Sequence, residues 1–414
     1  MLVLAPAAAS AAEADSWIGR FSDVSEWGDH SSPLTQSLAL LALTRAEGTA
    51  PSEAAVSLLL AQQCDEGGFP DAFVAPDDAC VGGVDTTAHV VMALDALDET
   101  AAVGDAVAWL AANQNDDGSY SSADGVNTTS TGLAALALNV GGFHDAVDAA
   151  RTWLRQVQDG CDTATPGALP FNADSRGEPQ MGTAQGALGF TDVSLAELTT
   201  TNADAQPTTG CDDGAVGDPG VAAAAFLVDA LVDGTHLVVQ DFPSVGATID
   251  VLFTLSAVGS GAATIDAIGA WLDEQIVGYT TEFDDDGPSG AYAGPTAKAA
   301  LAMLVLGEDP RSAAGVDLIE QLESLEVTED DTGVDDESVS DDARDGEDAD
   351  PPEDEDEAAD RATEDDSAQP SAEDDDQDAL PATGSTAALI ALAGVLCVAV
   401  GALTVRRTRQ VAPR

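Results

Sequence analysis

The sequence predicts an all-α fold in which about six helical hairpins close into a ring, followed by an acidic stalk and a C-terminal transmembrane helix. Three observations lead to this prediction. Two kinds of helical segment alternate between Ser31 and Leu325, with almost no strand-like alternation. About half of the residues from Glu326 to Asp378 are acidic. An apolar run, 385–405, and several arginines end the chain.

The first residues, 1–14, are interpreted as a secretory signal peptide that is truncated at its start. They contain an apolar stretch and a cleavage-like Ala9-Ser10-Ala11, but no basic residue precedes the apolar stretch. Export of the chain is therefore expected.

The cysteines agree with export into an oxidising environment. Cys397 lies in the C-terminal apolar run, which leaves Cys64, Cys80, Cys161 and Cys211 as an even set. Four thiols allow three pairings, and we favour pairing between sequence neighbours, Cys64 with Cys80 and Cys161 with Cys211.

Residues 17–325 are assigned to the ring domain, which consists of two kinds of helical segment. One kind is apolar on every face, which indicates burial on every face. These inner segments are 33–43, 85–97, 127–138, 182–190, 244–259 and 294–307. The other kind is amphipathic and is expected to cover the inner layer. These outer segments are 52–63, 104–114, 145–158, 221–232, 264–276 and 312–325.

Closure into a ring is favoured because an open array of six pairs would expose two apolar ends. Outer segments also end in a recurring motif of Gln, acidic residues, Gly and an aromatic residue. The four copies are QQCDEGGF (62–69), NQNDDGSY (113–120), QDGCDTATPGALPF (158–171) and EFDDDGPSGAY (282–292). They are similar to the Q-W repeats of squalene-hopene cyclases, with Phe or Tyr in place of Trp. About three quarters of the chain thus resembles the α/α toroid of terpene cyclases and protein prenyltransferases.

The acidic turn of this motif is interpreted as structural. Gly67, Gly118 and Gly287 supply backbone angles that end a helix and reverse the chain, while the acids accept hydrogen bonds from amides at the start of the next helix. Calcium binding at Asp116-Asp117-Gly118 or at 284–287 is the weaker alternative, because both lack the ligand spacing of an EF-hand loop.

The sequence lacks the sets of catalytic residues that the resemblance implies. The acidic strings 284–286 and 212–213 lie in repeat-type turns, unlike the D-x-D-D acid of triterpene cyclases, and aromatic residues make up only 4% of the chain. The histidines are scattered, which argues against a prenyltransferase zinc site, and there is no Cys-Gly-Glu-Gln thioester motif. No metal or cofactor is expected. Asp85, His89 and Asp286 are weak catalytic candidates.

Two polar triplets occupy matching positions at the starts of inner segments: Asp85, Thr86 and Thr87, and Asn127, Thr128 and Thr129. Their side chains are expected to cap helices, and they are candidates for lining one mouth of the ring. His89 lies one turn further on, where it is either a core histidine or a ligand-facing one with Asp85 fixing its tautomer. The long loop between Cys161 and Cys211 either covers a mouth or presents an outer surface.

The acidic residues after the ring, 326–379, are predicted to form a disordered stalk, because they include no aromatic residue and carry high like charge. The whole chain has a formal net charge of −62, which excludes nucleic acid as a partner.

The C-terminal residues, 380–414, have the order of a cell-wall sorting signal of Gram-positive bacteria. The LPXTG motif is Leu380, Pro381, Ala382, Thr383 and Gly384. A transmembrane segment (385–405) and a basic cytoplasmic tail (406–414) follow it. The resemblance implies that a sortase cuts after Thr383 and links the chain to peptidoglycan, so membrane insertion is transient and the protein is secreted and wall-anchored.

The sequence therefore favours a non-catalytic surface protein whose ring serves ligand binding or adhesion, with an unknown small-molecule, glycan or protein ligand. An extracellular enzyme of the terpene cyclase and prenyltransferase-like class is the alternative.

Overall fold

The computed structural model describes residues 17–332, except for 26–27, 77, 201–202, 204 and 285–286 and the side chains of 330 and 332. The predicted signal peptide, the stalk beyond 332, the sorting motif Leu380–Gly384 and the C-terminal apolar run lie outside the described residues, as does Asp286. In the described part of the chain, none of the helices is long and apolar enough to cross a membrane.

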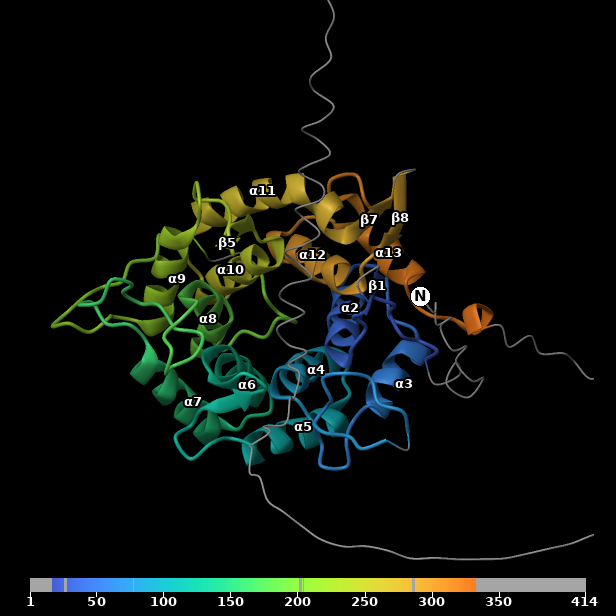
Figure 1. Ribbon diagram of the computed structural model, residues 1–414, viewed down its shortest axis with the longest axis horizontal. Helices are drawn as coiled ribbons and strands as arrows, with labels where there is room; N and C mark the ends of the chain where they lie inside the picture. The colour runs from blue at the N-terminus through green and yellow to red at the C-terminus, as the bar shows by residue number, and fades with distance from the viewer. Residues whose placement is uncertain are drawn as a thin grey trace, which may run out of the picture. The chain divides into compact units, whose positions relative to one another are not determined.

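Six inner helices form a closed circle. They are α2 (Pro33–Arg45), α4 (Val84–Ala96), α6 (Thr128–Val140), α8 (Pro179–Gly186) with its extension η1 (Ala187–Phe190), α10 (Val245–Val258) and α12 (Ala293–Leu306). Each packs against the next, and α12 packs against α2 (Figure 1). The predicted ring is therefore confirmed by contacts within the chain itself.

Six outer helices surround the inner ones, and each packs against the inner helix that precedes it. They are α3 (Glu53–Ala61), α5 (Thr100–Ala112), α7 (His144–Val157), α9 (Pro219–Ala230), α11 (Ala262–Thr280) and α13 (Leu318–Ser324). The start expected for α13, at 312, is wrong. Residues 310–312 form a 3-10 turn (η2, Pro310–Ser312), Gly315 adopts a positive φ, and Asp317 caps α13 by accepting hydrogen bonds from Ile319 and Glu320.

Four short antiparallel hairpins each lead directly into an inner helix, and none of them was expected from the sequence. They are β1–β2 (Val24–Ser25, Gly28–Asp29), β3–β4 (Tyr120–Ser122, Gly125–Asn127), β5–β6 (Val238–Val239, Phe242–Pro243) and β7–β8 (Thr281–Asp284, Gly287–Ala291). Because every outer helix turns the chain back, the inner helices all run in one direction and their N-termini share one mouth of the ring. The hairpins therefore lie around this mouth.

On five inner helices a buried side chain accepts a hydrogen bond from the segment before that helix, which in four cases is the turn after an outer helix. Backbone amides of these segments donate to a side chain on the fourth or fifth residue of the inner helix, at 2.8 to 3.0 Å. The acceptors are Gln36, Thr87, Thr131, Thr183 and Thr248, and Thr296 occupies the sixth equivalent position and donates to Gln321. All six, here called the clasp residues, are at most 1% exposed.

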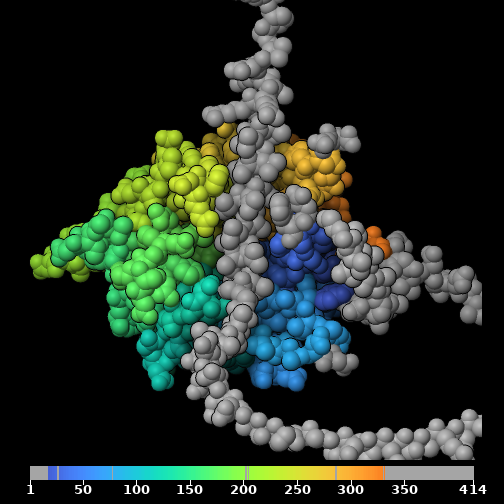
Figure 2. Space-filling view, in the orientation of Figure 1, coloured from blue at the N-terminus to red at the C-terminus, as the bar shows by residue number. Residues whose placement is uncertain are grey.

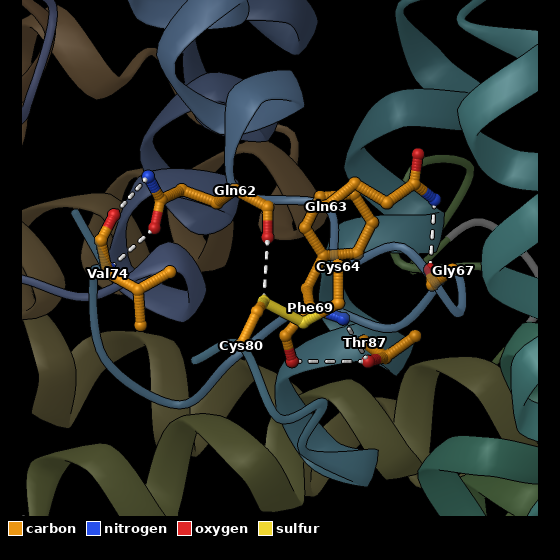
Figure 3. Close-up of a disulfide and its surroundings, with 8 residues drawn as sticks. All are labelled: Gln62, Gln63, Cys64, Gly67, Phe69, Val74, Cys80 and Thr87. Carbon is orange, nitrogen blue, oxygen red and sulfur yellow. Dashed lines mark hydrogen bonds between the residues drawn. A yellow bond between two sulfur atoms is a disulfide. The ribbon is translucent and has the colours of Figure 1, made fainter. Parts of the chain in front are cut away.

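The glutamine of the recurring motif joins consecutive outer helices. Gln114 Nε2 donates to the carbonyl of Gly118 in its own turn at 3.0 Å and to that of Ala146 in the first turn of α7 at 2.9 Å. Gln63 and Gln158 make the same pair of bonds in their repeats, and Figure 3 shows the bond from Gln63 to Gly67.

Two glycines of these turns behave as expected, whereas Asp117 has other partners than expected. Gly67 and Gly118 have positive φ in the turns that follow α3 and α5, as expected, whereas Gly287, also with positive φ, begins β8 in a hairpin and does not end a helix. Asp117 accepts from the hydroxyl and amide of Ser119 inside its own turn, which lowers its pKa, and the Trp153 side chain of α7 lowers it further; no backbone amide at the start of a helix is among these donors. The structural interpretation of the turn is confirmed, whereas the proposed partner of its acid is wrong.

Both predicted disulfides are confirmed. Cys64 pairs with Cys80 across a separation of 16 residues, and Cys161 pairs with Cys211 across 50. The first lies between the end of α3 and the segment that enters α4 (Figure 3). Cross-links of this length are expected to stabilise the fold by about 3 to 4 kcal/mol each through loop-closure entropy.

The first and last parts of the described chain meet where the ring closes. Gly19 and Ser22 donate backbone hydrogen bonds to Val327 and Leu325, both at 2.8 Å, and Val327 donates in return to Arg20. We call this pairing of 19–22 with 325–327 the closure seam. Beside it, Asp23 accepts from the amide of Gly294 in the first turn of α12. The ring domain thus includes residues that had been assigned to the stalk. Figure 2 shows one face of the molecule in the same orientation as Figure 1.

Replacing Gly118 with Ala is expected to destabilise the protein by about 3 kcal/mol, because both the positive φ and a close contact oppose a side chain. A Cβ there would lie 2.4 Å from the carbonyl oxygen of Ala149 in α7. Gly142 is the matched control, since its φ is +73° but nothing lies within 4 Å of a Cβ. Gly142→Ala should cost only about 1 kcal/mol. Urea unfolding followed by circular dichroism measures the free energy of unfolding of both variants. Equal losses would contradict the close contact between Gly118 and α7.

Candidate functional site

The interior of the ring can be assigned from the clasp residues. An α-helix advances about 100° per residue, and the clasp residues face outward. The residues two positions before, two positions after and five positions after each clasp residue therefore face the interior of the ring. Three interior layers follow. The upper layer, nearest the N-terminal mouth, is Leu34, Asp85, Thr129, Met181, Gly246 and Gly294. The middle layer is Leu38, His89, Leu133, Gln185, Asp250 and Lys298. The lower layer is Leu41, Met92, Leu136, Leu188, Phe253 and Leu301.

The upper layer contains two glycines that leave room for polar groups from outside the inner ring. A Cβ at Gly246 would lie 3.2 Å from the hydroxyl of Tyr279, a residue of α11. A Cβ at Gly294 would lie 3.0 Å from a carboxylate oxygen of Asp23. Tyr279 of α11 and Asp23, which lies beside the closure seam, therefore reach the interior at these points.

The middle layer carries four polar side chains from four different inner helices. Lys298 Nζ lies 2.7 Å from Asp250 Oδ1, with side-chain exposures of 19% and 10%. Gln185 Nε2 donates to the other carboxylate oxygen of Asp250 at 3.0 Å. Lys298 is the only lysine of the chain. No role had been predicted from the sequence for Gln185, Asp250 or Lys298.

His89 faces these groups across the ring. Burial lowers its pKa, the Lys298 ammonium lowers the pKa further, and the Asp250 carboxylate opposes the shift. Since α2 separates α4 from α12, these charges act on His89 through the ring interior.

The tautomer of His89 follows from its hydrogen bond. Nδ1 lies 2.8 Å from the backbone carbonyl of Asp85, which can only accept, so Nδ1 carries the proton and Nε2 is an acceptor. Asp85 therefore fixes the tautomer, as expected for a ligand-facing histidine, but it does so through its backbone. The hydroxyl of Tyr279 completes the cluster as a donor, because burial raises its pKa and keeps it protonated.

The lower layer closes the ring below the polar groups. All six of its side chains are at most 4% exposed, whereas His89, Gln185 and Lys298 are half-buried. The accessible part of the interior therefore lies on the side of the N-terminal mouth.

The opposite mouth is covered by part of the loop between Cys161 and Cys211. Arg45, at the end of α2, donates to the carbonyls of Leu195 and Leu198, both at 2.7 Å. Thr200 donates to Val305 at the end of α12, and Asn139 at the end of α6 donates to Asp192. Leu195 and Leu198 are at most 5% exposed. Of the two expectations for this loop, the structure supports covering a mouth.

The other predicted mouth residues have mostly structural roles. Asn127 caps α6 by accepting from the amide of Ser130 at 2.8 Å, as expected. Thr87 is a clasp residue, Thr86 donates to Asp71, and Thr128 donates to the carbonyl of Pro170. Thr129 belongs to the upper layer and is 8% exposed.

Asp85 does not cap α4, since the N-cap is Gly83. Burial raises the pKa of Asp85 to about 6, and the carboxylates of Asp71 and Asp124 act in the same direction, while the Ser130 hydroxyl opposes them. Its Oδ1 atom is buried without a hydrogen-bond partner among the described residues.

No protein family model and no curated protein matches this sequence. Among solved structures, a protein from Actinoplanes is 17% identical, with a TM-score of 0.44 over 76% of this chain and 98% of that one. The type II terpene cyclase MstE from Scytonema is 16% identical, with a TM-score of 0.42 over 64% and 76%. A variant of that cyclase in complex with geranylgeranyl dihydroxybenzoate is 14% identical, with a TM-score of 0.43 over 76% and 96%. These identities and TM-scores are too low to transfer residue roles or an activity to this chain.

The raised pKa of Asp85 makes the free energy of unfolding depend on pH. The native state holds the proton up to about pH 6, and the unfolded chain releases it near 3.8, so stability should fall by about 3 kcal/mol as pH rises from 4 to 7. Asp85→Asn should remove this contribution, while Asp148→Asn, at an exposed position on α7, should keep it. The test is to measure the free energy of unfolding of each protein from pH 4 to 7. Identical pH profiles for Asp85→Asn and wild type would refute the raised pKa of Asp85.

Proposed function

We propose that the ring is a surface-displayed receptor that binds a small polar ligand in its middle layer. The supporting observation is the cluster of His89, Gln185, Asp250 and Lys298 at equivalent positions of four inner helices. A ring needs only apolar side chains to fill its interior, as the lower layer shows. Desolvating an ion pair there brings no evident gain in stability, so a binding role accounts for it better.

The groups of the cluster indicate the chemistry of the ligand. Lys298 and the Tyr279 hydroxyl donate hydrogen bonds, and His89 Nε2 accepts one. Because the charges of Lys298 and Asp250 already neutralise each other, the cluster favours an uncharged ligand over an ion. A molecule with hydroxyl or carbonyl groups fits this pattern, because a hydroxyl both donates and accepts.

Display at the cell surface is supported by the sequence alone. The LPXTG motif, the apolar run and the basic tail follow one another in the order of a sorting signal, and two disulfides agree with an oxidising environment. We therefore propose sortase and peptidoglycan as partners and the cell wall as the location.

An extracellular enzyme of the terpene cyclase and prenyltransferase-like class is the second candidate. The observation that favours it is Asp85, a buried carboxyl at the mouth that keeps its proton up to about pH 6 and is thereby suited to donate it. His89 is the weaker candidate acid, since its pKa is lowered. If the protein is such an enzyme, it should turn over a substrate and Asp85→Asn should abolish the turnover. A receptor should bind its ligand without turnover.

Ligand binding is expected to depend on the ion pair. The double change Lys298→Met and Asp250→Leu removes both charges together and leaves no unpaired one in the interior. Compounds from a library of neutral polar metabolites that wild-type protein retains should bind about tenfold more weakly to the double variant, a loss of roughly 1.4 kcal/mol. Asp148→Asn, at an exposed position on α7 away from the middle layer, should leave affinity intact. Titration calorimetry measures the affinities, and equal binding by wild type and double variant would exclude the middle layer as the site.

Wall attachment is expected to depend on Thr383, whose carbonyl the sortase would transfer. In cells that produce Thr383→Ala, the chain should stay in the membrane fraction after treatment with a muralytic enzyme, whereas wild type should appear in the released wall fraction. Thr386→Ala makes the same chemical change in the apolar run and is a control that should behave as wild type. Release of Thr383→Ala with wall fragments would contradict sortase anchoring.

A further inference from the structure

A second group of polar side chains lies at the N-terminal mouth, apart from the middle layer. A pocket of about 150 Å³, here called the mouth pocket, opens between the segment that enters α4 and the β3–β4 hairpin. Asp71, Gly82, Gly83, Asp85, Ser121 and Ser122 line it.

The mouth pocket brings two carboxylates together without a cation. Asp85 Oδ1 is buried and has no partner among the described residues. Asp71 Oδ1 accepts only a neutral hydroxyl donor, Thr86, at 2.7 Å. The four salt bridges of the described residues use other carboxylates. Negative charge in this pocket is therefore uncompensated within the described structure.

Glycine at position 83 allows this arrangement. A Cβ there would lie 1.8 Å from Asp71 Oδ1, so any side chain would push the Asp71 carboxylate out of its place. The backbone at the start of α4 thus leaves room for the Asp71 carboxylate beside the pocket that Asp85 also lines.

We propose that the mouth pocket binds a hard divalent cation, with Ca²⁺ as the preferred ion, between the carboxylates of Asp71 and Asp85. Among the described residues, no group of three or more His, Cys, Asp or Glu side chains is arranged so that it could hold a metal ion by itself. Hydroxyl oxygens, backbone carbonyls and water must therefore complete the coordination, which suits Ca²⁺ because it accepts six to eight oxygen ligands in flexible geometry. The net charge of −62 further raises the local concentration of cations.

Terbium luminescence on the full chain tests the proposal. Tb³⁺ replaces Ca²⁺ and emits strongly only when an excited aromatic ring is close by. Trp109 meets this condition, since a Cβ at Gly82 would lie 2.7 Å from its ring. Any cation that the acidic residues 326–379 attract should give no such signal, because this stretch contains no aromatic residue. Wild type should show a saturable signal that Ca²⁺ displaces.

Matched variants identify the ligands. Asp71→Asn and Asp85→Asn should each weaken Tb³⁺ and Ca²⁺ binding by about tenfold or more, since each removes a charged ligand. Asp105→Asn removes the same charge from a neighbouring exposed position on α5 and should leave both affinities unchanged. Circular dichroism verifies folding of every variant. Absence of a saturable signal in wild type, or equal affinity of Asp85→Asn and wild type, would overturn the proposal.

Discussion

Packing of α12 against α2 is the contact on which the remaining structure depends. It turns a row of hairpins into a circle and removes the two apolar ends that an open row would expose to water. It also gives all six inner helices one common interior. His89 and Lys298 are more than two hundred residues apart in the sequence, yet the Lys298 ammonium lowers the pKa of His89 because the circle is closed. The candidate site is therefore a consequence of ring closure, and no single hairpin contains it.

Much of this architecture could be predicted from the sequence, because segments that are apolar on every face alternate with segments that are apolar on one face only. All six inner and six outer helices were expected, and only their ends differ, as at α13. The hairpins could not be foreseen, since strands as short as Val24–Ser25 or Val238–Val239 contain no measurable alternation. Cysteine pairing followed from proximity in the sequence.

The candidate site was harder to predict, because a clasp threonine near a helix start resembles an ordinary cap. Thr87 was assigned to capping for this reason, although it binds a turn amide. Aligning the six inner segments on the clasp residues would have placed His89, Gln185, Asp250 and Lys298 in one column and revealed the middle layer. The uncompensated environment of Asp85 depends on loops from separate repeats, which no pattern within one segment indicates.

The closure seam has a mechanical consequence for a chain tethered through its C-terminus, as proposed above. Tension that arrives after residue 332 enters the domain at the pairing of 19–22 with 325–327. From there the force can pass to both α2 and α12, so it is distributed around the ring of inner helices in both directions. An open array pulled from its last repeat would peel from that end, one unit at a time. A circular receptor fastened where its two ends meet can instead resist shear in flowing surroundings while its mouth keeps its shape.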